Sequence, residues 1–178
     1  IFPPYFVAGA IYSGFAMVFT LAIPLRAAYG LQDFITDRHL DNSAKVMLAS
    51  GLVVAYGYLM EASMAWYSGH AFETYVFTNR FTGPYAPAYW SLIVCNIVIP
   101  QALWFRRVRR TPIALFFISL VINVGMWLER FIIVVVSLHR DHLPSSWGMY
   151  SPTFWDWALY LGTIGLFVSL LFLFIRFL

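Results

Sequence analysis

Five long apolar runs constrain this chain more than any other feature of its sequence. They are Phe6–Leu25, Met47–Ser68, Tyr85–Phe105, Ile113–Ser137 and Thr153–Ile175. Each reaches the roughly 20 residues that a helix needs to cross about 30 Å of hydrocarbon. A helix is favoured there because it pairs every backbone polar group within its own segment. We therefore expect an all-α integral membrane protein with five transmembrane helices.

The composition agrees with a surface that faces lipid. Hydrophobic residues make up 61% of the chain and charged residues only 11%, whereas soluble domains carry about 25% charged residues. The single cysteine, Cys95, rules out disulfides and cysteine-held iron–sulfur clusters within this chain. Intramembrane haem is disfavoured because all four histidines fall in loops or at helix ends: His39, His70, His139 and His142. We expect no cofactor and no metal bound by this chain.

The basic residues predict the orientation in the membrane. Five spans place the loops alternately on two sides, and only Arg80 and Arg140 fall on one of them. Arg130 lies within a span. The other side receives eight of the eleven basic residues: Arg26, Arg38, Lys45, Arg106, Arg107, Arg109, Arg110 and Arg176. By the positive-inside rule that side is cytoplasmic. The loops 69–83 and 138–151 then face the exterior.

Capping residues and prolines separate the runs. Prolines precede the first, third, fourth and fifth runs. Asp41 stands before the second run, where we expect it to be the N-cap. Pro24 and Pro100 lie near helix ends and should kink their helices locally. In the cytoplasmic stretch before the second run, Asp37 and His39 are candidates for taking up protons.

Three ionisable residues lie well inside predicted spans: Glu61, Glu129 and Arg130. Such groups cost about 2.5–3.5 kcal/mol each on insertion scales and are functional candidates for that reason. Glu61 stands seven residues before Ser68 and Glu129 eight before Ser137. At 1.5 Å per residue, both carboxyls would lie roughly 10–12 Å below the exterior surface.

The surroundings of the two glutamates are alike. Gly57 and Gly125 each stand four residues before a glutamate, hence on the same helix face. Around Glu61 this face is mostly small, which favours close helix packing and a carboxyl that points into a bundle. Its residues are Ser50, Val54, Gly57, Ala65 and Ser68. A second polar line runs at heptad spacing along the fourth span: Asn123, Arg130 and Ser137.

Three readings of these charges are open. Glu61 and Arg130 could form a structural ion pair that holds the bundle together. The carboxyls could instead form a proton relay, since burial and a nearby guanidinium tune a carboxyl in opposite directions. The charges could also form a buried site for a substrate ion.

The densest polar stretch is the exterior sequence His139, Arg140, Asp141 and His142. It is a candidate site for subunit docking or for a quinone headgroup, with an ordinary exposed loop as the alternative. Two histidines three residues apart could suit a metal, but without further ligands this is a weak signal.

Several stretches together resemble a known family. They are Phe2–Ala10, Arg38–Asp41, Gly125–Phe131, Ser137–Asp141 and Leu143–Trp147. They resemble the NrfD/polysulfide-reductase-type membrane subunits of bacterial alternative complex III, of which ActC and its paralogue ActF are the two forms. The chain begins without an initiator Met and ends without a polar tail, so we expect the C-terminal half of such a subunit.

The resemblance implies a multi-pass protein of the bacterial inner membrane in a respiratory or photosynthetic complex. Menaquinol or another quinol would be its substrate. The implied partners are an exterior iron–sulfur subunit, multihaem cytochrome c subunits and a paralogous membrane subunit, which carry the clusters and the haem c. Proton half-channels are proposed for each four-helix bundle of the family. We expect a bundle over residues 1–140, and an exterior loop with a peripheral helix over residues 141–178.

The leading hypothesis is thus a subunit that contributes to quinol oxidation and to a proton path through Glu61, Glu129, Arg130, Asn123, Asp37 and His39. The alternative is a structural anchor that docks exterior redox subunits without proton transfer. A secondary transporter ranks last, because Pro24 and Pro100 do not interrupt two helices at matching depths.

Overall fold

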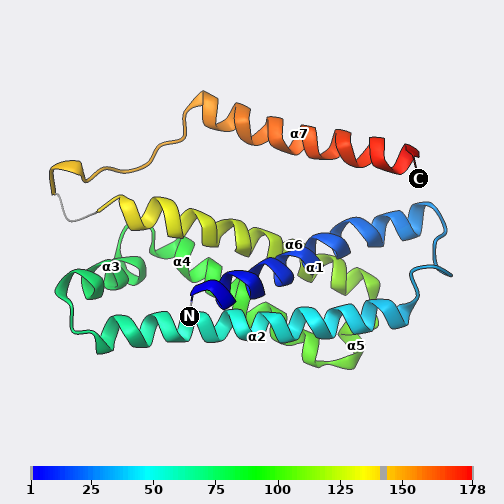
Figure 1. Ribbon diagram of the computed structural model, residues 1–178, viewed down its shortest axis with the longest axis horizontal. Coiled ribbons are helices and arrows are strands. Elements are labelled where there is room, and N and C mark those ends of the chain that lie inside the picture. The colour runs from blue at the N-terminus through cyan, green and yellow to red at the C-terminus, as the bar shows by residue number, and fades with distance from the viewer. Residues whose placement is uncertain (1, 141–143, 178) are drawn as a thin grey trace.

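The computed structural model describes residues 2–140 and 144–177, and its elements are helical throughout those ranges (Figure 1). In chain order they are α1 (Phe2–Ala28), α2 (Asp37–Tyr67), α3 (Ala71–Thr82), α4 (Ala86–Ile93), the π-helix η1 (Val94–Val98), the 3-10 helix η2 (Ile99–Trp104), α5 (Arg106–Arg109), α6 (Pro112–Phe131), the π-helix η3 (Ile132–Val136), the 3-10 turn η4 (Pro144–Ser146) and α7 (Phe154–Phe177).

The predicted all-α membrane fold is confirmed. Five helical segments of the described chain are long and apolar enough to span a bilayer. They are Pro3–Ala28, Asp37–Tyr67, Ala86–Trp104, Pro112–Val136 and Phe154–Phe177. The glycines Gly30 and Gly69 follow the first two, with φ of 65° and 62°. This left-handed conformation ends a helix at little cost only when the residue has no Cβ.

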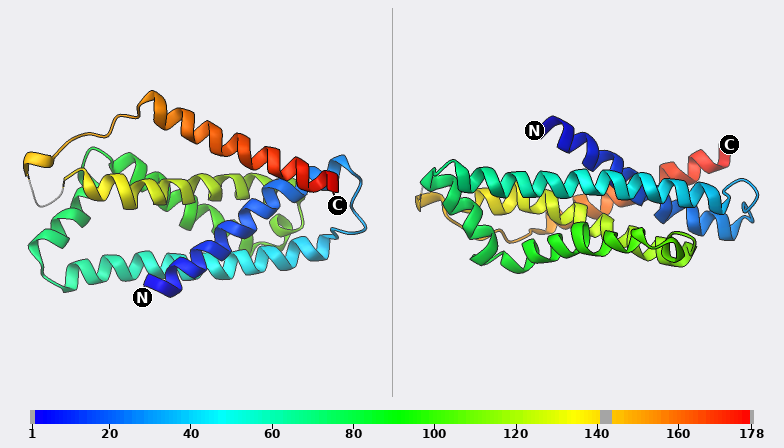
Figure 2. Two further views of the ribbon diagram at one scale, coloured as in Figure 1. Left: turned by 45° about the horizontal axis from the view of Figure 1, so that its top comes forward. Right: turned by 90° about the horizontal axis from the view of Figure 1, so that it is seen from below.

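Four of the spans form a bundle and the fifth is peripheral. Helix α1 crosses the bundle obliquely and packs against α2 and α6, while α4 and η1 pack against α6 (Figure 2). Large buried side chains fill the interior of the bundle, among them Tyr12, Phe19, Met47, Leu115 and Ile122. Helix α7 has no buried residue. Its apolar surface therefore remains available for lipid or another subunit.

The second helix begins earlier than predicted, and Asp41 is not its N-cap. Thr36 holds that position, with extended backbone angles (φ −74°, ψ 160°). The backbone N–H of Thr36 donates to Nδ1 of His39 at 3.3 Å. The prediction was wrong because the first turns of α2 are polar. Hydropathy detects only the apolar part of this helix and therefore places its N-terminus too late in the sequence.

Asp41 instead ties two spans together at the end that is predicted to be cytoplasmic. Its carboxylate lies 2.6 Å from Nζ of Lys45 and 2.9 Å from Nε of Arg109. Arg109 also donates from Nη1 to the carbonyl oxygens of Leu103 and Trp104, at 2.7 and 3.0 Å. Arg109 therefore donates hydrogen bonds to the carbonyl groups at the end of η2 and links that end to α2.

Loss of this cytoplasmic tie should be measurable. Asp41→Asn should lower the free energy of unfolding by about 1–3 kcal/mol, because it removes the charge from two short bonds. Thermal unfolding in detergent measures the effect, with the exposed Asp33→Asn as the control. Equal midpoints for the two variants would show that the contacts of Asp41 contribute no stability.

The third span is not one regular helix. It passes from α-helix through η1 to η2, with Pro100 buried in the last segment. Proline has no N–H to donate to the carbonyl four residues earlier, which here is that of Asn96. The hydroxyl of Tyr12 donates to that carbonyl oxygen at 3.3 Å instead. The predicted Pro100 irregularity thus coincides with a bond from α1 to the middle of the third span.

The loop 69–83, which is predicted to face the exterior, contains an additional helix. Helix α3 follows Gly69 and packs against α2 and α4 at the same end of the bundle as the segment after α6 (Figure 1). Ring stacking of Tyr75 with Trp147, centroids 6.2 Å apart, joins α3 to the segment after η4. The exterior end is therefore covered by packed side chains.

Candidate functional site

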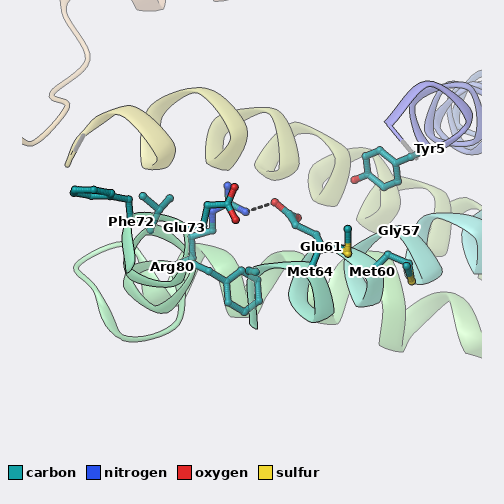
Figure 3. A pocket seen from close by; sticks show the side chains of 11 residues that line it. Tyr5, Gly57, Met60, Glu61, Met64, Phe72, Glu73 and Arg80 are labelled. Atoms are coloured by element: carbon teal, nitrogen blue, oxygen red, sulfur yellow. Dashed lines mark hydrogen bonds and ion pairs between the residues drawn. The ribbon is translucent and has the colours of Figure 1, made fainter. Parts of the chain in front are cut away.

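A pocket opens between α2 and α3 near the exterior end of the bundle (Figure 3). Its volume is about 410 Å³. The walls are mostly apolar, and the polar groups come from a tyrosine, two glutamates and an arginine. The lining residues are Tyr5, Gly57, Met60, Glu61, Met64, Ala65, Phe72, Glu73, Val76, Phe77 and Arg80.

Glu61, predicted to point into the bundle, reaches this pocket and is paired with Arg80. Nη1 of Arg80 donates to Oε1 of Glu61 at 2.6 Å (Figure 3). Nη2 of the same guanidinium donates to Oγ of Ser137 at 3.0 Å. Arg80 therefore joins α2, α3 and the end of the fourth span. The structural ion pair read from the sequence is corrected accordingly, since the partner of Glu61 is Arg80 and not Arg130.

The second glutamate lies in the bundle core. Glu129 is only 2% exposed, and its Oε2 accepts a short hydrogen bond from the hydroxyl of Tyr58. Nδ2 of Asn96 donates to the hydroxyl oxygen of Tyr58 at 3.2 Å. Among the described residues, no lysine, arginine or histidine nitrogen lies within 4.0 Å of the Glu129 carboxylate. The Glu129 carboxylate is thus bonded to the Tyr58 hydroxyl of α2, and that hydroxyl accepts in turn from the Asn96 amide of η1.

The glycine before each glutamate makes room for this polar cluster. A Cβ on Gly57 would overlap the ring of Tyr5, whose Cε2 would lie 2.7 Å away. A Cβ on Gly125 would overlap Oδ1 of Asn96 and stand 2.8 Å from Cβ of Cys95. The two similar sequence patterns therefore have a common physical reason, which is close approach by a neighbouring helix.

The polar line on the fourth span divides among different partners. Nδ2 of Asn123 donates to Oγ1 of Thr20 at 3.0 Å. Arg130 is exposed on the outside of the bundle, with its guanidinium 5.3 Å from the ring centroid of Phe6. Ser137 bonds to Arg80. Heptad spacing placed these residues on one helix face without bringing their side chains together.

The exterior candidates separate in the same way. His139 is buried, with Nδ1 2.7 Å from the carbonyl oxygen of Val136 and Nε2 3.5 Å from Nδ2 of Asn79. The guanidinium of Arg140 lies 5.5 Å from the ring of Trp147. Asp141 and His142 lie outside the described residues. Within residues 2–140 and 144–177, no cluster of three histidine, cysteine or acidic residues suits a metal.

At the cytoplasmic end, Asp37 and His39 stand together in the first turn of α2. Oδ1 of Asp37 accepts from Nη2 of Arg26 at 2.8 Å, and His39 bonds to Thr36 as described above. Both side chains therefore have local structural partners, and their part in proton uptake stays a prediction.

Comparison with known families decides the family of this chain. The sequence profile described as "Polysulphide reductase, NrfD" matches residues 1–140, more than three-quarters of the chain. The chain belongs to the NrfD family. Members of the NrfD family are membrane subunits of quinol-linked oxidoreductases. They partner with iron–sulfur and other redox subunits in the membrane. No curated protein matches the chain.

The NrfD match includes every residue of the pocket and of the buried cluster. Sequence reasoning found both glutamates of this NrfD chain but missed Arg80, Tyr58 and Asn96. The predicted topology places Arg80 in an exterior loop, and no charge in the apolar runs marks Tyr58 or Asn96. The close-packing glycines were a usable signal, because Gly57 and Gly125 marked the faces against which Tyr5 and Asn96 pack.

Proposed function

We propose that this NrfD-family chain is part of a quinol-oxidising complex of the alternative complex III type in the bacterial inner membrane. Within that complex it contributes to quinol oxidation and moves protons through its helix bundle. The observation that carries the proposal is the buried Glu129 carboxyl, held by Tyr58 without a cationic partner among the described residues. Ionisable groups inside spans are rare and mark proton or ion pathways.

The division of chemistry follows from quinol oxidation itself. A quinol that becomes a quinone releases protons together with electrons. Iron–sulfur and haem c groups in exterior partner subunits would take the electrons. Further protons that cross the membrane during turnover need groups that accept and release them, and in this proposal those groups are the carboxyls of this chain. The sequence from His139 to His142 stays the predicted docking site for quinol or for those partners, and menaquinol is one candidate substrate.

Glu61 is placed to connect this chemistry with the exterior. It lies in an open pocket near the exterior end, and its side chain is 37% exposed. Arg80 holds one oxygen of the carboxylate, and the pocket around it admits water or a small ligand. A carboxylate in this position can take up a proton from the bundle and release it toward the exterior.

Glu61→Gln should lower quinol-driven turnover about tenfold or more and change its pH dependence, because an amide cannot carry the proton. The measurement is quinol oxidation per assembled complex in native membranes. Glu73→Gln is the matched control. Glu73 lines the same pocket, but its carboxylate accepts from Ser68 at 2.8 Å and has no bond to Arg80. Unchanged turnover and pH dependence in Glu61→Gln would count against a proton-carrying role.

One observation favours the alternative of a structural anchor. Arg80 bonds to Glu61 and Ser137 and thereby ties three helices together at the exterior end. If that is the whole role of Glu61, Glu61→Gln lowers the amount and the thermal stability of the complex. Turnover per assembled complex then stays at the wild-type value. The same membranes therefore distinguish the two functions.

A further inference from the structure

One side chain stands between the exterior pocket and the buried cluster. Tyr5 of α1 lines the pocket together with Glu61 and Arg80. Its ring also packs edge to face against that of Tyr58, with centroids 5.9 Å apart and an interplanar angle of 68°. Figure 3 shows the Tyr5 hydroxyl oxygen directed into the pocket, on the side where Glu61 lies.

The position of the Tyr5 ring is fixed by its packing. The ring lies directly on the backbone of Gly57, where any Cβ would overlap it. Gly57 belongs to the same helix as Tyr58 and Glu61, one turn before the glutamate. A ring held in this way cannot swing out of place when its hydroxyl is removed. Its packing and its hydroxyl chemistry can therefore be tested separately.

Tyr5 therefore adjoins both polar groups. Its ring packs against that of Tyr58, whose hydroxyl donates to Oε2 of Glu129, and it lines the pocket beside Glu61. A phenol hydroxyl both donates and accepts a hydrogen bond. It can therefore receive a proton on one side while it releases its own on the other.

We infer that the Tyr5 hydroxyl is the proton-transfer link between Glu129 in the bundle core and Glu61 in the exterior pocket. In the step, the Glu129 carboxyl gives its proton to the phenol oxygen, and the phenol's own proton passes to the Glu61 carboxylate. Tyr5 ends as a neutral phenol, Glu129 as a carboxylate and Glu61 as a carboxylic acid. The inference rests on the proposed proton-carrying function and adds the residue that connects its two carboxyls.

The test is the hydrogen–deuterium exchange of the Glu129 carboxyl in the intact complex. Infrared spectroscopy follows the carboxyl C=O band that disappears in Glu129→Gln, after transfer of the membranes to D₂O. Tyr5→Phe keeps the ring on Gly57 and removes only the hydroxyl. It should slow exchange of this band about 100-fold, which is the lower end for a positioned proton-transfer group.

Tyr12→Phe is the control, because it removes another buried hydroxyl of α1. That hydroxyl bonds to the carbonyl of Asn96 and lies outside the pocket. In Tyr12→Phe, the Glu129 carboxyl should exchange at a rate close to that of the wild-type protein. A wild-type exchange rate in Tyr5→Phe, or equal slowing in both variants, would overturn the link. So would the absence of any band that Glu129→Gln removes.

The outcome separates this inference from the proposed function. If Tyr5→Phe exchanges normally while Glu61→Gln abolishes proton-coupled turnover, the function stands and the link is wrong. If Tyr5→Phe slows exchange but quinol turnover and its pH dependence are unchanged, the link exists and the proposed function fails.

Discussion

Glu129→Gln should reduce quinol-driven turnover about 100-fold or more in complexes that still assemble. Glutamine has nearly the same shape as glutamate, and its side-chain oxygen can still accept the hydrogen bond from Tyr58. The packing of this buried position is therefore retained, whereas the side chain can no longer take up and release a proton. No other carboxyl lies in the described core, because the remaining buried polar residues are Ser50, Asn79, Asn96, Ser119 and His139.

The measurement is quinol oxidation per assembled complex, together with the thermal midpoint of each preparation. Glu129→Asp serves as the companion variant, since it keeps a carboxyl on a shorter side chain and should retain part of the activity. A Glu129→Gln complex with wild-type turnover, wild-type pH dependence and an unchanged midpoint would refute the role of Glu129.

Gly125→Ala should strongly destabilise the bundle. The added Cβ would overlap Oδ1 of Asn96 and lie 2.8 Å from Cβ of Cys95. Overpacking of a close-packed interior costs about 1–3 kcal/mol. Displacement of the Asn96 amide adds about 1–3 kcal/mol, because its bond to the Tyr58 hydroxyl is then broken in a buried place.

Complex yield and thermal unfolding in detergent measure this effect. Gly162→Ala on α7 is the matched control, because a Cβ there meets nothing within 4 Å. It should match the wild-type protein or exceed it slightly, since alanine favours helix. If Gly125→Ala unfolds at the same temperature as Gly162→Ala, the contact between α6 and η1 is looser than described.

The spans were predictable because hydropathy over about 20 residues is a local property of the chain. The two glutamates were predictable for the same reason, since a charge inside an apolar run stands out. Their partners were not. The pairs Arg80 with Glu61 and Tyr58 with Glu129 join different helices. The periodicity of a single helix does not show which other helices pack against it.

Two irregular segments illustrate the same limit. Pro100 signalled a disturbed helix, but the sequence alone could not show that Tyr12 takes the carbonyl that the proline leaves free. The π-helix η1 carries Asn96, and η3 begins three residues after Glu129. Single-turn π-helices occur often at functional sites. Here they flank the one buried carboxyl of the described bundle.

Proton release to the exterior per electron tests the central claim most directly. It is measured in sealed membranes during a short pulse of quinol oxidation. The claim predicts that the wild-type complex releases more protons than the oxidised quinol supplies. The residual turnover of Glu129→Gln should release only the protons of the quinol itself. A Glu129→Gln complex with the full wild-type ratio of protons to electrons would contradict a proton path through this bundle.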